Sequence, residues 1–101
     1  MMDKTTRAAF ARLLEVARRD TGQSRRIASF ILAWWNATDL GGFDLTDLFA
    51  VDRELASDMA TVFSFISNRH TPIYPKEYQD EIVALARQWR PSRTLSRQPA
   101  S

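Results

Sequence analysis

The chain has 101 residues, of which 45% are apolar and 26% are charged, and it contains no cysteine. These fractions are typical of a globular protein and exclude the low hydrophobicity of a disordered chain. The lack of cysteine excludes a disulfide framework, a thiolate metal site and a cysteine nucleophile. A domain of this length buries about 60 to 65% of its unfolded surface, so we expect it to fold without a disulfide or a bound metal to stabilise it.

The N-terminal segment and the apolar runs predict neither a secretory signal nor a membrane span. The first 19 residues lack both the apolar core and the small-residue cleavage pattern of a signal peptide. The longest apolar run, residues 27–35 interrupted by Ser29, has nine residues, whereas a membrane-spanning helix needs about 20. We therefore expect a cytoplasmic protein that does not enter a membrane.

The net charge of +2 conceals an uneven distribution along the chain. Residues 1–38 carry seven Lys or Arg against three Asp or Glu, giving +4; residues 39–68 carry one against six, giving −5. Residues 69–101 carry six against three, giving +3. These segments either pair with one another, where each exposed pair contributes little, or present opposite patches to partners. We favour internal pairing and keep the patches as the alternative.

Hydrophobic periodicity predicts two helices in the first half of the chain. The first covers about residues 6–20 and repeats apolar residues at i, i+3, i+4 and i+7 from Phe10 onward. The second follows Ser24 as a candidate N-cap and ends in the pair Trp34-Trp35. Because the second is apolar around much of its circumference, we expect it to be the central, most buried helix.

The second half of the chain predicts two more helices separated by loops. After a glycine break at residues 41–42, residues 43–49 predict a helical turn or short helix, either joined to or separate from the next helix. The third helix covers about residues 53–67, and its apolar residues share one stripe. The fourth starts at about Pro75 and ends before Pro91. The third helix's stripe consists of Leu55, Met59, Val62, Phe63 and Ile66.

Together these patterns predict an all-α fold. We expect a compact bundle or array of four main helices, with a short capping helix or turn before the third. Residues 1–91 are expected to form a single helical domain, and residues 92–101 a disordered tail in which Leu95 is the one large apolar residue. No segment alternates with a period of two, so we predict no sheet.

Catalytic and metal-binding signatures are not present in the sequence. His70, the one histidine, lies in a proline-flanked loop, and the spacing of the aspartates matches no calcium-binding loop. No strained turn motif presents a serine near a base. We therefore predict a protein that is not an enzyme and uses no cofactor.

The region around the tryptophan pair and the acidic segment is the candidate partner-binding surface. Adjacent residues on a helix point about 100° apart, so both indoles cannot occupy the centre of one stripe. Trp35 either packs in the core under the glycine turn, which we favour, or stays exposed as an interface anchor. We predict partner binding through Trp35, Asp44, Asp47 and Asp52.

The arginines around Gly22 are the candidate nucleic-acid-binding residues. The order of a helix, a glycine-containing turn and a second helix superficially resembles the DNA-binding helix-turn-helix motif. A recognition helix, however, needs polar side chains directed at base edges, and the helix after Gly22 is mostly apolar. This alternative would use Arg18, Arg19, Arg25 and Arg26.

Three runs of the sequence resemble a small family of uncharacterised bacterial proteins that are often carried on plasmids and integrated mobile elements. The runs are LLEVARRDTGQSRRIASFILAWWNA, GGFDLTDLFAVDRELASDM and ARQWRP. The resemblance spans about residues 8–91 and implies a bacterial, cytoplasmic accessory protein, without assigning an activity or site. Our leading hypothesis is a non-enzymatic module that binds another protein, with a nucleic-acid-associated regulator as the alternative. We also keep a homodimer as an expectation, because apolar surface left uncovered on so small a bundle would need a self-complementary copy to cover it.

Overall fold

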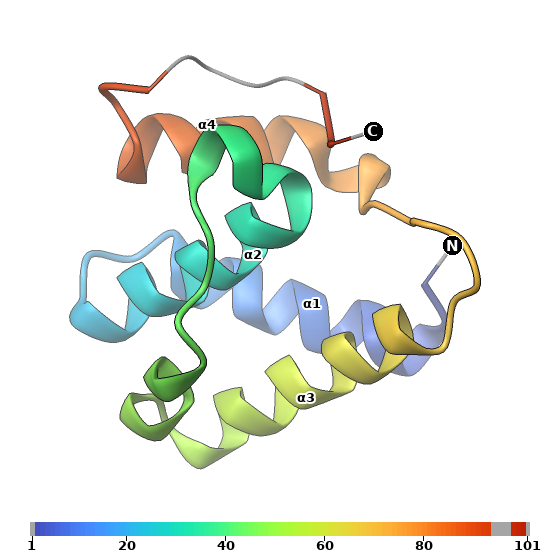
Figure 1. Ribbon diagram of the computed structural model, residues 1–101. Helices are drawn as coiled ribbons and strands as arrows, with labels where there is room; N and C mark the ends of the chain where they lie inside the picture. Colours follow the sequence, from blue (N-terminus) through green and yellow to red (C-terminus); the bar gives the residue numbers. More distant parts are fainter. Residues whose placement is uncertain (1, 94–97, 101) are drawn as a thin grey trace.

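The protein folds into a compact set of helices, seen in a computed structural model that describes residues 2–93 and 98–100 (Figure 1). Four α-helices form the frame, and two short 3-10 helices, η1 and η2, precede α3 and α4. The predicted all-α class is confirmed, and no strand occurs among the described residues. The elements are α1 (Lys4–Ala17), α2 (Gly22–Leu40), η1 (Leu45–Ala50), α3 (Arg53–Ser67), η2 (Lys76–Tyr78) and α4 (Gln79–Trp89).

Helix α1 is the element on which the frame is built. It packs along both α2 and α3, and α4 packs on α2, whereas α2 and α3 make no extensive contact with each other (Figure 1). Its buried stripe has the predicted spacing, and Phe10 and Leu13 are fully buried. Burying one large apolar side chain contributes about 1.5 to 3 kcal/mol relative to leaving it exposed.

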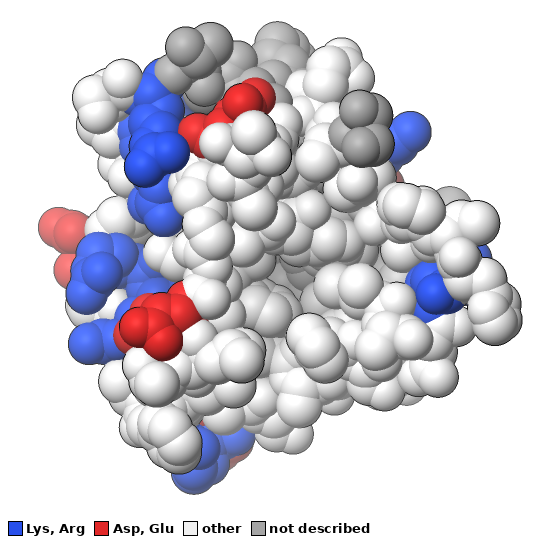
Figure 2. Space-filling model, in the orientation of Figure 1, with Lys and Arg blue, Asp and Glu red and all other residues white. Residues whose placement is uncertain are grey.

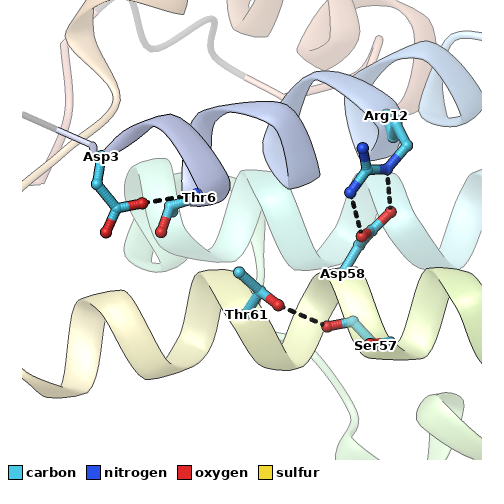
Figure 3. A network of polar contacts seen from close by, with 6 residues as sticks. All are labelled: Asp3, Thr6, Arg12, Ser57, Asp58 and Thr61. Atoms are coloured by element: carbon cyan, nitrogen blue, oxygen red, sulfur yellow. Dashed lines mark hydrogen bonds and ion pairs between the residues drawn. The ribbon is translucent and has the colours of Figure 1, made fainter.

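Polar contacts set the start of α1 and its register against α3 (Figure 3). The sequence offers Thr5 or Thr6 as the N-cap of this helix, but the N-cap is Asp3, whose carboxylate accepts the backbone N–H of Thr6 at 2.7 Å. Further along, the guanidinium of Arg12 donates to both carboxylate oxygens of Asp58 on α3, at 3.0 and 2.9 Å (Figure 3). This two-point pairing leaves the partly exposed arginine over a largely buried carboxylate.

Helix α2 has eight buried residues, more than any other helix, as its apolar circumference predicts, but it shares the central position with α1, because each of the two packs on two other helices. It starts one turn before the predicted Ser24, because Thr21 caps it by accepting the backbone N–H of Ser24 at 3.0 Å. It kinks at Asn36, whose side-chain oxygen accepts the backbone N–H of Asp39 in place of a helical carbonyl. The helix ends at Gly41, which has a φ of 95°. Only a glycine adopts this conformation without a steric cost.

Two short elements complete the frame. The segment after the glycine turn forms the separate 3-10 helix η1, because the extended Val51 divides it from α3. The predicted bounds of the third helix, residues 53–67, match α3. The fourth helix begins with the 3-10 turn η2 directly after Pro75 and becomes α-helical at Gln79.

The predicted disordered tail falls partly on residues 94–97 and 101, including Leu95, which lie outside the described residues. Nearer the chain end, the backbone N–H of Ala100 donates to the carbonyl oxygen of Trp35 at 2.8 Å. Among the described residues, no helix is both long and apolar enough to cross a membrane.

Candidate functional site

An apolar hollow lies between α2, η1 and α3. Because α2 and α3 both pack on α1 without extensive contact with each other, their facing apolar residues are left uncovered. The hollow has a volume of about 590 Å³. We call it the apolar hollow; its lining consists of Phe30, Phe43, Leu45, Leu48, Arg53, Ala56, Met59, Ala60, Phe63, Ser64 and Ser67.

Large apolar side chains are exposed at this hollow and beside it. Leu45 is 68% exposed and Phe63 is 59% exposed, and both line the hollow. Phe49, 84% exposed, lies on the same 3-10 helix as Leu45. A fully exposed aromatic side chain presents about 150 to 250 Å², so these three side chains alone offer a few hundred Å². Apolar patches of that size on small proteins are frequently functional.

The predicted apolar stripe of α3 is buried only in part, and Phe63 is exposed. Met59 and Val62 are buried against α1, whereas Phe63 lies at the edge of the stripe that faces the hollow. The stripe is wider than the surface that α1 covers, because α2 does not come close enough to cover the remainder. The periodicity of a sequence indicates that a helix has an apolar face, but it does not indicate which element packs on that face.

Figure 2 shows the face of the molecule that is turned to the viewer in Figure 1. Blue and red side chains lie toward its margins, and its middle is uncoloured and hollowed. A broad uncharged middle with a polar margin resembles the organisation of protein interfaces, whose centres are depleted in charged residues.

The three predicted acidic residues take different positions around η1. Asp44 is exposed and caps η1, accepting from the hydroxyl of Thr46 at 2.8 Å and from its backbone N–H at 2.9 Å. These hydrogen bonds lower the pKa of Asp44, with the Thr46 side chain as the larger cause. Asp47 is half-buried and lies 3.6 Å from Arg26. Asp52 precedes α3 and accepts from the side-chain amide of Gln23 at 3.4 Å.

The two adjacent tryptophans differ in burial, and this difference excludes Trp35 as an exposed interface anchor. Trp35 is fully buried in the core, so its predicted role in partner binding is wrong and the favoured core position is confirmed. Trp34 is the half-buried member, and its indole N–H donates to the carbonyl of Ile73 at 2.8 Å. Its ring meets Phe10 edge to face, at 5.8 Å between centroids and 83° between planes. The pair therefore fixes the core and the loop after α3.

The predicted arginines are joined by others from the end of α4. Arg18, Arg19 and Arg25 are exposed at the α1–α2 turn, while Arg26 is half-buried beside Asp47. The α4 end is held against this turn, because the Gln88 amide donates to the carbonyls of Arg18 and Arg19 at 3.2 Å each. We call the exposed group the arginine face; it consists of Arg18, Arg19, Arg25, Arg87 and Arg93.

No group of three or more histidine, aspartate or glutamate side chains among the described residues is placed to hold a metal ion. His70 is exposed in the loop after α3, at the rim of a separate hollow of about 460 Å³ that Trp34 and Ala100 also line. The arrangement brings no aspartate to the rim of that hollow.

The chain belongs to a family of unknown function (DUF7673), whose model matches residues 7–90. The match covers all four α-helices except the start of α1. It confirms the expectation of an uncharacterised family. No curated protein and no solved structure matches the chain.

Proposed function

We propose that this member of a family of unknown function is a non-enzymatic interaction module that binds an amphipathic helix of another protein in the apolar hollow. Leu45 on η1 and Phe63 on α3 both line that hollow and are both exposed, and this joint exposure supports the proposal. Removing such side chains from water is favourable, and their exposure forgoes this free energy. A partner that covers them would gain that free energy on binding.

A helix is the occupant that fits the shape of the hollow. The α3 residues of its lining run from Arg53 to Ser67, which at 1.5 Å per residue is about 21 Å, or roughly four helical turns. Strand addition needs the edge of a sheet, and the described part of the chain has no strand. A bound helix of that length presents apolar anchors at i, i+3 or i+4, and i+7.

Charge at the margin of the hollow adds a preference for a basic flank on that helix. Asp44 stands between the lining residues Phe43 and Leu45 and is exposed. Asp44 is ionised at neutral pH, since its pKa lies below the ordinary value of 3.8. Arg53 also lines the hollow, but its guanidinium donates to the carbonyls of Leu48 and Val51. A lysine or arginine on the partner near Asp44 would therefore favour encounter and orientation.

The biological setting that we propose follows from the resemblance noted in the sequence. It is that of an accessory protein in the bacterial cytoplasm, encoded on a plasmid or integrated element. An accessory protein that acts by binding a host or element-encoded factor needs no catalytic group of its own.

The test is affinity capture from a nuclease-treated lysate of the encoding organism. The tagged wild-type chain is compared with Leu45→Ser/Phe63→Ser and with the matched control Ala8→Ser/Ala84→Ser, whose positions are exposed and outside the hollow. We expect a protein retained by the wild type and the control and lost from the hollow variant. A peptide from that protein, helical and apolar on one face, should bind the wild type at least about tenfold more tightly than the variant.

Two outcomes of this capture contradict the proposal. If all three chains retain the same proteins, the hollow is not the binding surface. The second outcome is capture of the untagged chain that the organism itself makes, lost when Leu45 and Phe63 are replaced. The hollow would then serve self-association, and the proposal of a helix from another protein would be wrong.

A further inference from the structure

The arginine face is a second surface, separate from the apolar hollow. Its five members come from the end of α1, the first turns of α2, and the end of α4 with the residues that follow it. None of them lines the hollow. In Figure 2 blue side chains lie along the left margin, with red side chains among them, away from the uncoloured middle.

The arginine face has an excess of positive charge, since the exposed Asp20 is the one acidic residue between Arg18 and Arg25 in the sequence. Arg7, Arg12 and Arg26 each lie within ion-pair distance of a carboxylate. No such pair involves the five members of the arginine face among the residues that the structure describes. Arg93 instead donates to the backbone carbonyl of Asp39, at 3.2 Å.

The like charges at this face lie close enough to affect one another. Arg90, half-buried beneath them, donates to the carbonyls of Leu40 and Trp89 and to the hydroxyl of Ser29. Burial lowers the pKa of Arg90, and the charges of Arg93 and Arg25 lower it further. Arg25 also lies near the N-terminus of α2, where the helix dipole disfavours a cation. A bound anion would relieve both effects.

The surroundings of the arginine face favour phosphate over a protein surface. The three most exposed large apolar side chains, Leu45, Phe49 and Phe63, all lie elsewhere, so this face lacks the apolar centre of a protein interface. Guanidinium groups spread over three elements match a repeating polyanion, because each one pairs with a separate phosphate.

The same surface does not read bases. Beyond its first turn, α2 turns its side chains into the core, with Ile27, Ala28 and Ile31 fully buried, so it cannot act as a recognition helix. This burial argues against the helix-turn-helix version of the nucleic-acid alternative. The indole N–H of Trp89 donates to the carbonyl of Ala17 at 2.9 Å, and the ring is half-buried, which leaves it unsuited to stacking on single-stranded bases.

We propose that the arginine face binds the phosphate backbone of double-stranded nucleic acid without reading its sequence. The five guanidinium groups set the upper limit of the contacts. Each phosphate contact to duplex DNA contributes about −0.9 to the slope of log affinity against log salt. We therefore expect a slope between about −3 and −4.5 for three to five contacts.

The experiment is a fluorescence-anisotropy titration of a labelled duplex of about 20 base pairs, at salt concentrations from about 50 to 200 mM. The variant Arg25→Glu/Arg87→Glu reverses two exposed charges of the face. The control Lys4→Glu/Lys76→Glu changes the net charge equally at exposed positions on α1 and η2. We expect the arginine variant to bind at least about tenfold more weakly with a slope reduced by about 2, and the control to stay within about threefold.

Three results would overturn the proposal. They are an absence of duplex binding at the lowest salt concentration, an equal loss in both variants, and tighter binding of a single strand of the same length. An RNA duplex and a DNA duplex, run in parallel, distinguish the source of the phosphates. The hollow variant Leu45→Ser/Phe63→Ser should bind the duplex like the wild type, so this proposal and the proposed function fail separately.

Discussion

Single polar residues decide where helices begin in this chain. The sequence places threonines at the start of α1 and a serine at the start of α2, yet the caps are Asp3 and Thr21. Each cap lies upstream of its predicted position, because several neighbouring residues have suitable side chains and only the packed structure selects one. Hydrophobic periodicity nevertheless locates the start of each helix to within a turn, whereas α2 continues past its predicted end at Trp35 to Leu40.

The cap at Asp3 predicts a pH dependence. Two hydrogen bonds from Thr6 lower the pKa of Asp3 from its ordinary value of 3.8. The bond from the backbone N–H has the larger effect, and the bond from the side-chain hydroxyl has the smaller one. Its contribution to stability is therefore fully present above that value and is lost as the pH falls through the folded-state pKa. Asp3→Ala should unfold at a lower urea concentration than the wild type at pH 7, and the difference between the two should narrow as the pH falls below 3.8.

Asp3→Asn is the control for this prediction, since an asparagine caps without titrating. It should stay close to the wild type at pH 7. A gap between Asp3→Ala and the wild type that is unchanged at low pH would show that the carboxylate charge is not the cause.

At the scale of the element, α2 shows how a predicted break becomes a specific conformation. The two glycines predict a turn, but only Gly41 has a positive φ, at 95°. A Cβ at Gly41 would have room, with its nearest neighbour atom in Arg90 at 3.9 Å. The requirement for glycine there is therefore a property of the backbone and not of packing.

This difference between the two glycines predicts different effects for the same substitution. Gly41→Ala should lower the free energy of unfolding by about 1 to 2 kcal/mol, because an alanine at positive φ is strained. Gly42→Ala should change it by less than about 0.5 kcal/mol or stabilise slightly, since that position has open space and no positive φ. Urea denaturation of both variants measures this. Equal losses would place the constraint in the turn as a whole.

At the scale of the whole molecule, the placement of helices around α1 determines which apolar residues form the core. The sequence supports the all-α class, four main helices and a central α2 through periodicity alone. It does not distinguish Trp35 from Phe63, since both lie on apolar stripes. That distinction depends on α2 and α3 packing on α1 without covering each other. The arginines at the end of α4 were missed for the same reason, because the fold brings them to the α1–α2 turn.

The core and the hollow should therefore respond differently to truncation. Trp35→Ala should lower the free energy of unfolding by about 3 to 5 kcal/mol, the range for a large buried aromatic residue. Phe49→Ser, at a position that is 84% exposed, should lie within about 0.5 kcal/mol of the wild type. Chemical denaturation of both variants checks this. A loss of more than about 2 kcal/mol at Phe49 would mean that η1 contributes to the monomer core.

The most direct measurement of the central claim is photo-cross-linking from inside the hollow. A photoreactive phenylalanine analogue at Phe63 and, in a control chain, at the exposed Ala84 of α4 would be irradiated in cells of the encoding organism. We predict an adduct to one other protein from position 63, mapping to a helical segment of that protein, and no such adduct from position 84. Adducts of the same proteins from both positions, or none from position 63, would contradict a helix-binding hollow.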